Sequence, residues 1–125
     1  MLNYRSLELG ALSDVIKHEH GKVFLHDVLE LTGMEVSINC VPKGFKVPFK
    51  HKHKENEELY IFLKGDGVLM IDDARVKVKE GTCVKILPAG SRTLENVGED
   101  NLQYICIQTK ENSLDEFGLG DAKLD

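Results

Sequence analysis

The sequence lacks the features that would place the protein in a membrane or on nucleic acid. No stretch approaches the roughly 20 consecutive apolar residues that a membrane-spanning helix needs. The formal net charge is −5, and the lysines alternate with apolar residues instead of forming a basic patch. We therefore expect neither a membrane nor a nucleic acid as a partner of this chain.

The N-terminal residues and the cysteines indicate a cytoplasmic protein. Residues 1–15 lack the charged-then-apolar pattern of a secretory signal peptide. The sequence has 3 cysteines, an odd number, and they are scattered through strand-like segments as Cys40, Cys83 and Cys106. That distribution favours buried, reduced thiols over a disulfide framework. Packing is the role that we expect for all of them, and metal ligation by one of them is the alternative.

Helical periodicity is nearly absent, as are internal repeats and low-complexity segments, and strand signals dominate. The chain of 125 residues is long enough for one domain with a buried core. Short apolar runs between glycine, proline and aspartate turns indicate strands over residues 22–31, 34–41, 49–54, 58–64, 68–72, 75–79, 82–87 and 102–109. Such spacing predicts an all-β fold, an antiparallel sandwich or barrel. We expect its core over about residues 22–109 and a polar C-terminal tail over 110–125.

The most informative stretch is residues 44–65, GFKVPFKHKHKENEELYIFLKG. In a strand, side chains two positions apart point the same way, so His51 and His53 share one face and the flanking lysines share the other. Lysines mark the face that meets water, and we therefore expect the histidines to point inward. A second His-x-His pair, His18 and His20, precedes a glycine loop with no carboxylate in register, and we expect it on the surface.

A carboxylate follows the inward-pointing histidines at the start of the next strand. Glu58 would share its face with Tyr60 and Phe62, whereas Glu57 would share the opposite face. Two imidazoles and one carboxylate that converge from neighbouring strands suit a divalent transition metal and leave positions open for water or substrate. The alternative is a solvated polar turn. The register of the carboxylate, the glycine and the strand favours the metal site.

This stretch resembles the first motif of the cupins, in which a glycine, a His-x-His pair, a glutamate and a second glycine follow one another. Those places are filled by Gly44, His51, His53, Glu58 and Gly65. One irregularity is that 6 residues separate Gly44 from His51, where the motif usually has about five. The glutamate at 58 fits better than its neighbour at 57, because 6 residues separate it from Gly65 as in the motif.

The resemblance implies a cupin-type antiparallel jelly-roll β-barrel with a pocket between two packed sheets. It implies a divalent ion held by His51, His53 and Glu58, for which we expect zinc, with iron, manganese or nickel as alternatives and no organic cofactor. It also implies a homodimer, for which the amphipathic region 22–41 could serve. Proteins of the family include dioxygenases, sugar isomerases and epimerases.

The second cupin motif is incomplete in this chain. Its glycines, proline and asparagine are recognisable in GTCVKILPAGSRTLEN as Gly81, Pro88, Gly90 and Asn96. Its histidine is absent: counting forward from the second glycine reaches Thr93, and counting back from the asparagine reaches Arg92. Two interpretations follow. Either Arg92 clamps an anionic ligand that also coordinates the metal, or Arg92 points to solvent and Thr93 lines the pocket.

Two classes of function remain open. The first is a metal-dependent enzyme that activates oxygen, or acts as a Lewis acid, on a small anionic molecule. The second is a non-catalytic module that binds or senses such a molecule, with or without metal, and the lost histidine favours it. Besides the three metal ligands, the candidate pocket residues are Glu57, Tyr60, Phe62, Arg92 and Thr93. Glu57 and Tyr60 are also the candidate general bases.

Overall fold

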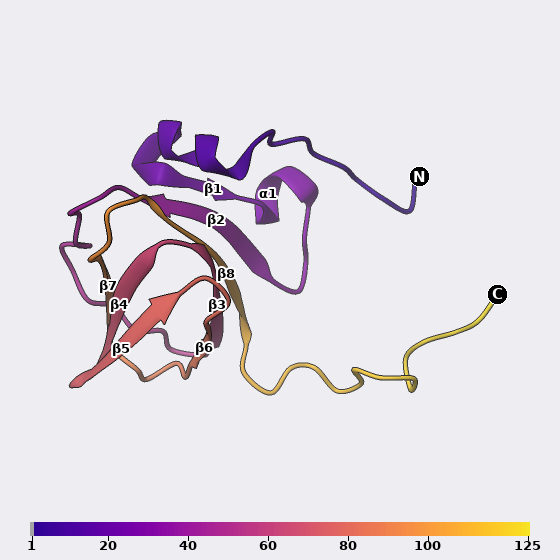
Figure 1. Ribbon diagram of the computed structural model, residues 1–125. Coiled ribbons are helices and arrows are strands. Elements are labelled where there is room, and N and C mark those ends of the chain that lie inside the picture. Colours follow the sequence, from indigo (N-terminus) through magenta and orange to yellow (C-terminus); the bar gives the residue numbers. More distant parts are fainter. Residues whose placement is uncertain (1) are drawn as a thin grey trace.

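The structure is a computed structural model that describes residues 2–125, and most of its regular elements are β-strands (Figure 1). The strands are β1 (Lys22–Phe24), β2 (Glu35–Val41), β3 (Asn56–Lys64), β4 (Asp66–Ile71), β5 (Ala74–Lys79), β6 (Cys83–Ile86), β7 (Arg92–Asn96) and β8 (Leu102–Lys110). The short helices are η1 (Leu12–Lys17), η2 (Glu19–Gly21) and α1 (His26–Leu29). None of these helices is long and apolar enough to cross a membrane. The residues after β8 extend away from the barrel (Figure 1).

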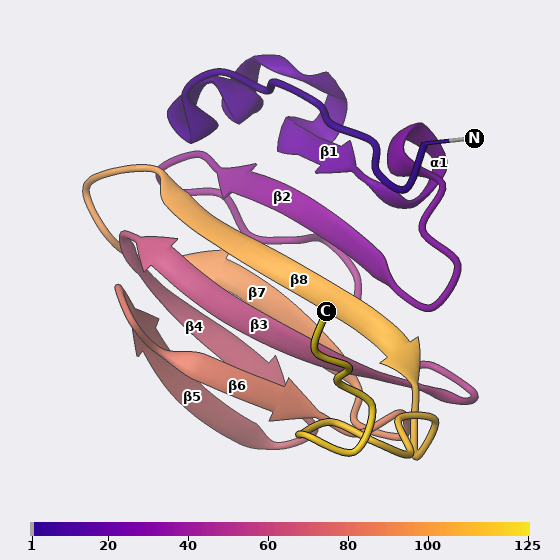
Figure 2. The same cartoon turned by 90° about the vertical axis from the view of Figure 1, so that its right-hand side faces the viewer.

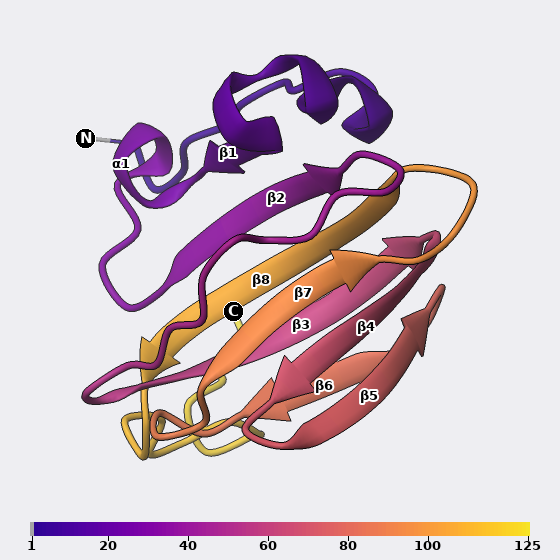
Figure 3. The same ribbon diagram turned by 90° about the vertical axis from the view of Figure 1, so that its left-hand side faces the viewer.

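The strands form two antiparallel sheets that face each other. The larger sheet has the order β1-β2-β8-β3-β6, and the smaller has the order β5-β4-β7 (Figures 2 and 3). The irregular segment between β2 and β3 runs alongside β7, to which it is joined by the bridges Lys46↔Glu95 and His51↔Arg92 (Figure 3). The all-β jelly-roll barrel expected from the sequence is confirmed.

The main core fills the space between the two sheets. Alternate residues of β3 point inward, because successive side chains of a strand face opposite ways, and Tyr60 and Phe62 are 7% and 1% exposed. The ring of Tyr104 on β8 packs against both, with its centroid 5.4 Å from each. Aromatic rings bury a large apolar area, and this cluster therefore packs the inner face of the paired strands β3 and β8.

A second, smaller core lies on the outer face of the larger sheet. Ile38 and Cys40 of β2 point outward and pack against Val15 of η1, which is 1% exposed. The N-terminal segment thus covers one end of this face, as Figure 2 shows. β2 is buried on both faces, because Ser37 and Asn39 point toward the barrel interior while their neighbours join the outer core.

Several local predictions were wrong. The run 22–31 divides into β1 and α1, since a short apolar run cannot be assigned to strand or helix by periodicity alone. The segment 49–54 forms a single bridge instead of a strand. β7 was not predicted, because its short polar sequence becomes a strand through pairing with β4. Cys83 is exposed, whereas Cys40 and Cys106 are buried as expected.

Two turn glycines give a test of the barrel geometry. Gly65, between β3 and β4, has a φ of 96°, and a Cβ added there would lie 2.7 Å from the carbonyl oxygen of Asn101. Gly81 has a φ of 86° and no atom within 4 Å of such a Cβ. We expect Gly81→Ala to lower the free energy of unfolding by about 1 kcal/mol, the cost of the left-handed backbone alone. Gly65→Ala should cost about 3 kcal/mol, because the backbone contact adds to that strain.

Urea denaturation of both variants and the unsubstituted protein measures the difference. Equal losses of stability would contradict the close approach of residues 65 and 101 in the folded barrel.

Candidate functional site

The histidines of the candidate site lie on an irregular segment that is pinned to two other parts of the chain. The backbone N–H of His51 donates to the carbonyl of Arg92 at 3.1 Å, and Arg92 returns the bond at 2.9 Å. The N–H of His53 donates to the carbonyl of Pro88 at 2.9 Å. These bonds hold the segment extended, so both imidazoles point into the barrel and the flanking lysines remain exposed. The histidines and lysines therefore alternate between the inner and outer sides as predicted for a strand, although the segment is not one.

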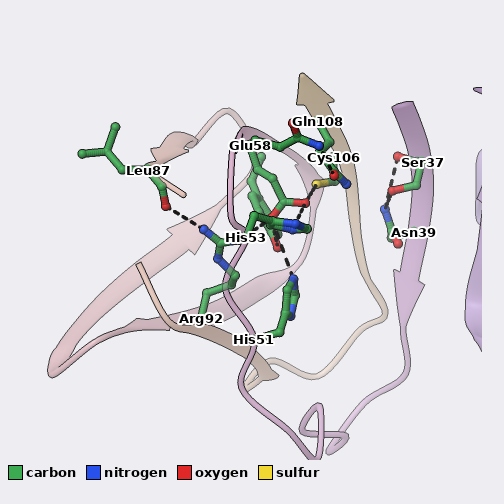
Figure 4. A network of polar contacts seen from close by, with 11 residues as sticks. Ser37, Asn39, His51, His53, Glu58, Leu87, Arg92, Cys106 and Gln108 are labelled. Carbon is green, nitrogen blue, oxygen red and sulfur yellow. Dashed lines mark hydrogen bonds and ion pairs between the residues drawn. The ribbon is translucent and has the colours of Figure 1, made fainter. Parts of the chain in front are cut away.

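The two imidazoles converge on one carboxylate from β3 (Figure 4). Nε2 of His53 lies 3.4 Å from Oε2 of Glu58, and Nε2 of His51 lies 4.0 Å from Oε1. The ligand atoms of the three residues all lie within 4.8 Å of one another, and within residues 2–125 they are the one such group of His, Cys, Asp or Glu. The Glu58 side chain is 6% exposed, while those of His53 and His51 are 23% and 41% exposed. Divalent transition metals take these ligand types.

The carboxylate of Glu58 also accepts hydrogen bonds from three other side chains. Nη1 of Arg92 donates to Oε1 at 3.0 Å, and the hydroxyl of Tyr60 lies 3.5 Å from the same oxygen. The thiol of Cys106 donates to Oε2 at 3.3 Å. Cys106 is the direct cross-strand partner of Tyr60, which brings it to the same face as Glu58. Sequence reasoning missed this contact, because only the β3–β8 register could have revealed it.

Arg92 is buried, with 1% of its surface exposed, and does not point to solvent. Its second terminal nitrogen, Nη2, donates to the carbonyl of Leu87 at 2.9 Å. The guanidinium is therefore held between a backbone carbonyl and the carboxylate of Glu58 (Figure 4). The interpretation in which Arg92 faces water is wrong. The hydroxyl of Thr93 donates to the carbonyl of Val47, and Thr93 lines the barrel cavity.

Burial sets the protonation of the groups around the carboxylate. Burial lowers the pKa of His51, the charges of Arg92 and His53 lower it further, and the charge of Glu58 opposes them. Burial raises the pKa of Tyr60 far above the usual phenol range. Burial, together with the charge of Glu58, raises the pKa of Cys106 in the same way. At neutral pH, His51 is therefore a neutral imidazole, whereas Tyr60 and Cys106 keep their protons and act as donors.

Two adjoining cavities meet at the site. The larger encloses about 820 Å³ and opens beside η2, where the exposed His18 and His20 line it. The smaller encloses about 160 Å³ and is lined by His53, Glu58 and Cys106, among others. His51, Tyr60 and Tyr104 line both. The carboxylate and imidazoles thus lie at the inner end of a space that reaches the surface.

The structure separates the predicted pocket residues into two groups. Tyr60, Arg92 and Thr93 line the larger cavity. Phe62 packs in the core and lines neither cavity. Glu57 is a half-buried residue on the opposite face of β3, paired with Thr109, because neighbouring side chains of a strand point opposite ways. Glu57 therefore lies away from the carboxylate of Glu58 and from both cavities.

Comparison with known proteins identifies related chains. Uncharacterized protein MJ1618 of Methanocaldococcus jannaschii is 36% identical over 66 residues, which are 53% of this chain and 52% of that protein. The chain therefore spans about half the length of this curated relative. The crystal structure of a cupin protein from Bacteroides fragilis is 36% identical, with a TM-score of 0.88 over 100% of this chain and 99% of that one.

A sugar phosphate isomerase from the cupin superfamily of Silicibacter pomeroyi shares the fold. It is 20% identical, with a TM-score of 0.64 over 84% of this chain and 68% of that one. The profile of the cupin domain family matches residues 38–108, which include both histidines, Glu58 and Arg92. That match, with the close likeness to the Bacteroides fragilis protein, shows that the chain belongs to the cupin family.

Proposed function

We propose that this cupin binds a divalent metal ion in its barrel and uses the ion to bind, or to transform, a small anionic molecule. His51 and His53 would hold the ion through Nε2, and Glu58 through Oε2. The observation that carries the proposal is the missing hydrogen-bond partner of one ring nitrogen of His53. Its Nε2 is buried and has no hydrogen-bond partner among residues 2–125, although it faces a carboxylate. Buried polar atoms normally have a partner, and a metal ion would supply one.

The hydrogen bonds of Glu58 leave its two oxygens different. Oε1 accepts from Arg92, which fixes the carboxylate plane, and Oε2 faces His53. A metal ion on Oε2 would therefore leave the bond to Arg92 in place. Glu58 is the one acidic side chain that directly contacts the two imidazoles and the guanidinium within the described chain. The loaded site would thus have a net positive charge, which favours an anionic ligand at the open coordination positions.

We propose zinc as the ion, with iron, manganese and nickel as the alternatives that the same donors accept. Bound zinc would supply Lewis-acid polarisation of a ligand oxygen, and bound iron would supply oxygen activation. Tyr60 keeps its proton at neutral pH and donates a hydrogen bond to Glu58, so it would not serve as a base. A homodimer and a cytoplasmic location remain predictions.

A second candidate function is a metal-free binding module. It is favoured by the ion pair between Arg92 and Glu58, whose N–O distance is 3.0 Å. In that function the guanidinium neutralises the carboxylate in the way that a metal would. The two candidates differ in metal content, which the first of the following experiments measures.

We expect purified protein, dialysed against zinc and then against metal-free buffer, to retain about one ion per chain. His53→Ala should retain less than about a tenth of that amount, because two ligands hold the ion much more weakly than three. Inductively coupled plasma mass spectrometry gives the stoichiometry, and circular dichroism shows whether the variant is folded.

The matched control is His20→Ala, which alters the other His-x-His pair on an exposed turn. It should leave the zinc content unchanged. Zinc lost equally from both variants, or no zinc in the unsubstituted protein, would refute the proposed site and leave the metal-free module.

Zinc affinity should fall as the pH is lowered, because an imidazole must be neutral to bind a metal. Burial lowers the pKa of His51, so the neutral form persists below the ordinary histidine value of about 6.5. We expect little change of affinity between about pH 8 and pH 7, and then a loss of about tenfold per pH unit for each protonated histidine. Competition with a chelator of known affinity at each pH measures this. A flat profile down to about pH 5 would exclude imidazole ligands.

Arg92→His should strengthen zinc binding by about tenfold or more. The change removes a positive charge 3.0 Å from Glu58 and places a third imidazole, and so a fourth ligand, at the barrel position that faces it. Thr93→His is the matched control, because Thr93 is the other position at which the missing histidine could be aligned. Chelator competition compares the two variants. Stronger binding in the Thr93 variant alone would mean that the histidine position lies at 93.

A further inference from the structure

We propose that the ligand of the barrel is a carboxylic acid carried on a bulky apolar body, an aryl or branched aliphatic group. The inference rests on the proposed function, since the carboxylate would bind at the metal. It goes further because it names the chemical class that the walls of the cavity accept.

The size of the cavity favours a ligand much larger than a simple dicarboxylate. The larger cavity encloses about 820 Å³, within the roughly 300–1,000 Å³ of pockets that take drug-sized ligands. It is lined by His51 and Tyr60 of the site and also by residues of η2. A ligand anchored at the histidines would therefore extend along this space.

Much of the cavity wall is apolar, and it begins at His51, whose ring centroid lies 6.3 Å from that of Phe49. Phe24 of β1 and Phe45 and Phe49 of the segment between β2 and β3 line it, and they are 55%, 47% and 62% exposed. They are three of the 5 phenylalanines in the sequence. Val47 and Leu94 continue the same wall. Large apolar side chains left in water around one cavity indicate a binding surface for an apolar group.

The cavity also has cationic side chains beside the carboxylate site. Arg92 contacts Glu58, and Lys22 lines both cavities. The one carboxylate of the lining, Glu19, lies on the exposed η2 turn. With the ion bound, the site would attract an anion, and the phenylalanines beside it would disfavour a polar body. A sugar phosphate fits poorly, because its hydroxyl groups would lose their water without gaining partners along the phenylalanines.

Calorimetric titration of the zinc-loaded protein with four probes tests the proposal. The probes are 3-phenylpropanoate, propanoate, 3-phenylpropan-1-ol and glucose 6-phosphate. We expect 3-phenylpropanoate to bind at least about tenfold more tightly than each of the others, since it alone has both the charge and the ring. Equal or tighter binding of propanoate or glucose 6-phosphate would overturn the proposal.

A pair of variants locates the apolar subsite. Phe49→Ala should weaken 3-phenylpropanoate binding by about tenfold and leave propanoate binding unchanged, because the ring loses its apolar contact. Phe117→Ala, which alters a phenylalanine of the exposed C-terminal tail, should change neither. If Phe49→Ala, Phe45→Ala and Phe24→Ala all bind 3-phenylpropanoate as the unsubstituted protein does, the assignment of the apolar wall is wrong.

The zinc content of each sample, measured by mass spectrometry, separates the two proposals. Protein that retains zinc but shows no preference for 3-phenylpropanoate would overturn the ligand class alone. Protein that loses zinc but still prefers 3-phenylpropanoate, with Arg92 and Lys22 as the cations, would overturn the metal site alone.

Discussion

A carboxylate enclosed in the barrel is the constraint on which the rest of the site depends. An ionised carboxylate removed from water costs several kcal/mol unless opposite charge and hydrogen-bond donors surround it. Glu58 has them from a guanidinium, a thiol and a phenol, which donate to its oxygens, and two imidazoles also face the carboxylate. These groups come from β3, β7, β8 and the segment before β3. Neutralisation of one charge thus draws both sheets and the connecting segment together.

The same constraint explains the role of Arg92, one of the two positions at which the histidine of the second cupin motif could be aligned. A guanidinium cannot ligate a metal, but it neutralises the carboxylate permanently, since it stays protonated at every accessible pH. The barrel is therefore stable around Glu58 whether or not an ion is bound. Weaker metal affinity is the expected cost, because the cation repels the incoming ion. With an ion bound, Glu58 would have two positive partners, Arg92 on Oε1 and the ion on Oε2.

Much of the architecture could be predicted from the sequence, and the reasons differ by element. The inward direction of His51 and His53 followed from alternation with lysines, and the choice of Glu58 over Glu57 followed from motif spacing. Both inferences used only residues that are close together in the sequence. The strand of Arg92 and the thiol of Cys106 could not be found, because each is defined by pairing across the sheets. The helix after β1 was missed since its first backbone N–H is bonded by Glu35, nine residues away.

The double burial of β2 bears on how small a working fragment can be. The profile of the family begins at residue 38, within β2, whereas Val15 of the N-terminal segment lies over Ile38 and Cys40. A protein trimmed to the matched residues would uncover this outer patch and lose β1, the neighbour of β2 in the sheet. It would also lose Lys22 and Phe24 from the cavity wall. The first quarter of the chain is thus part of the barrel's structural unit, and shortened versions would invite edge-to-edge association.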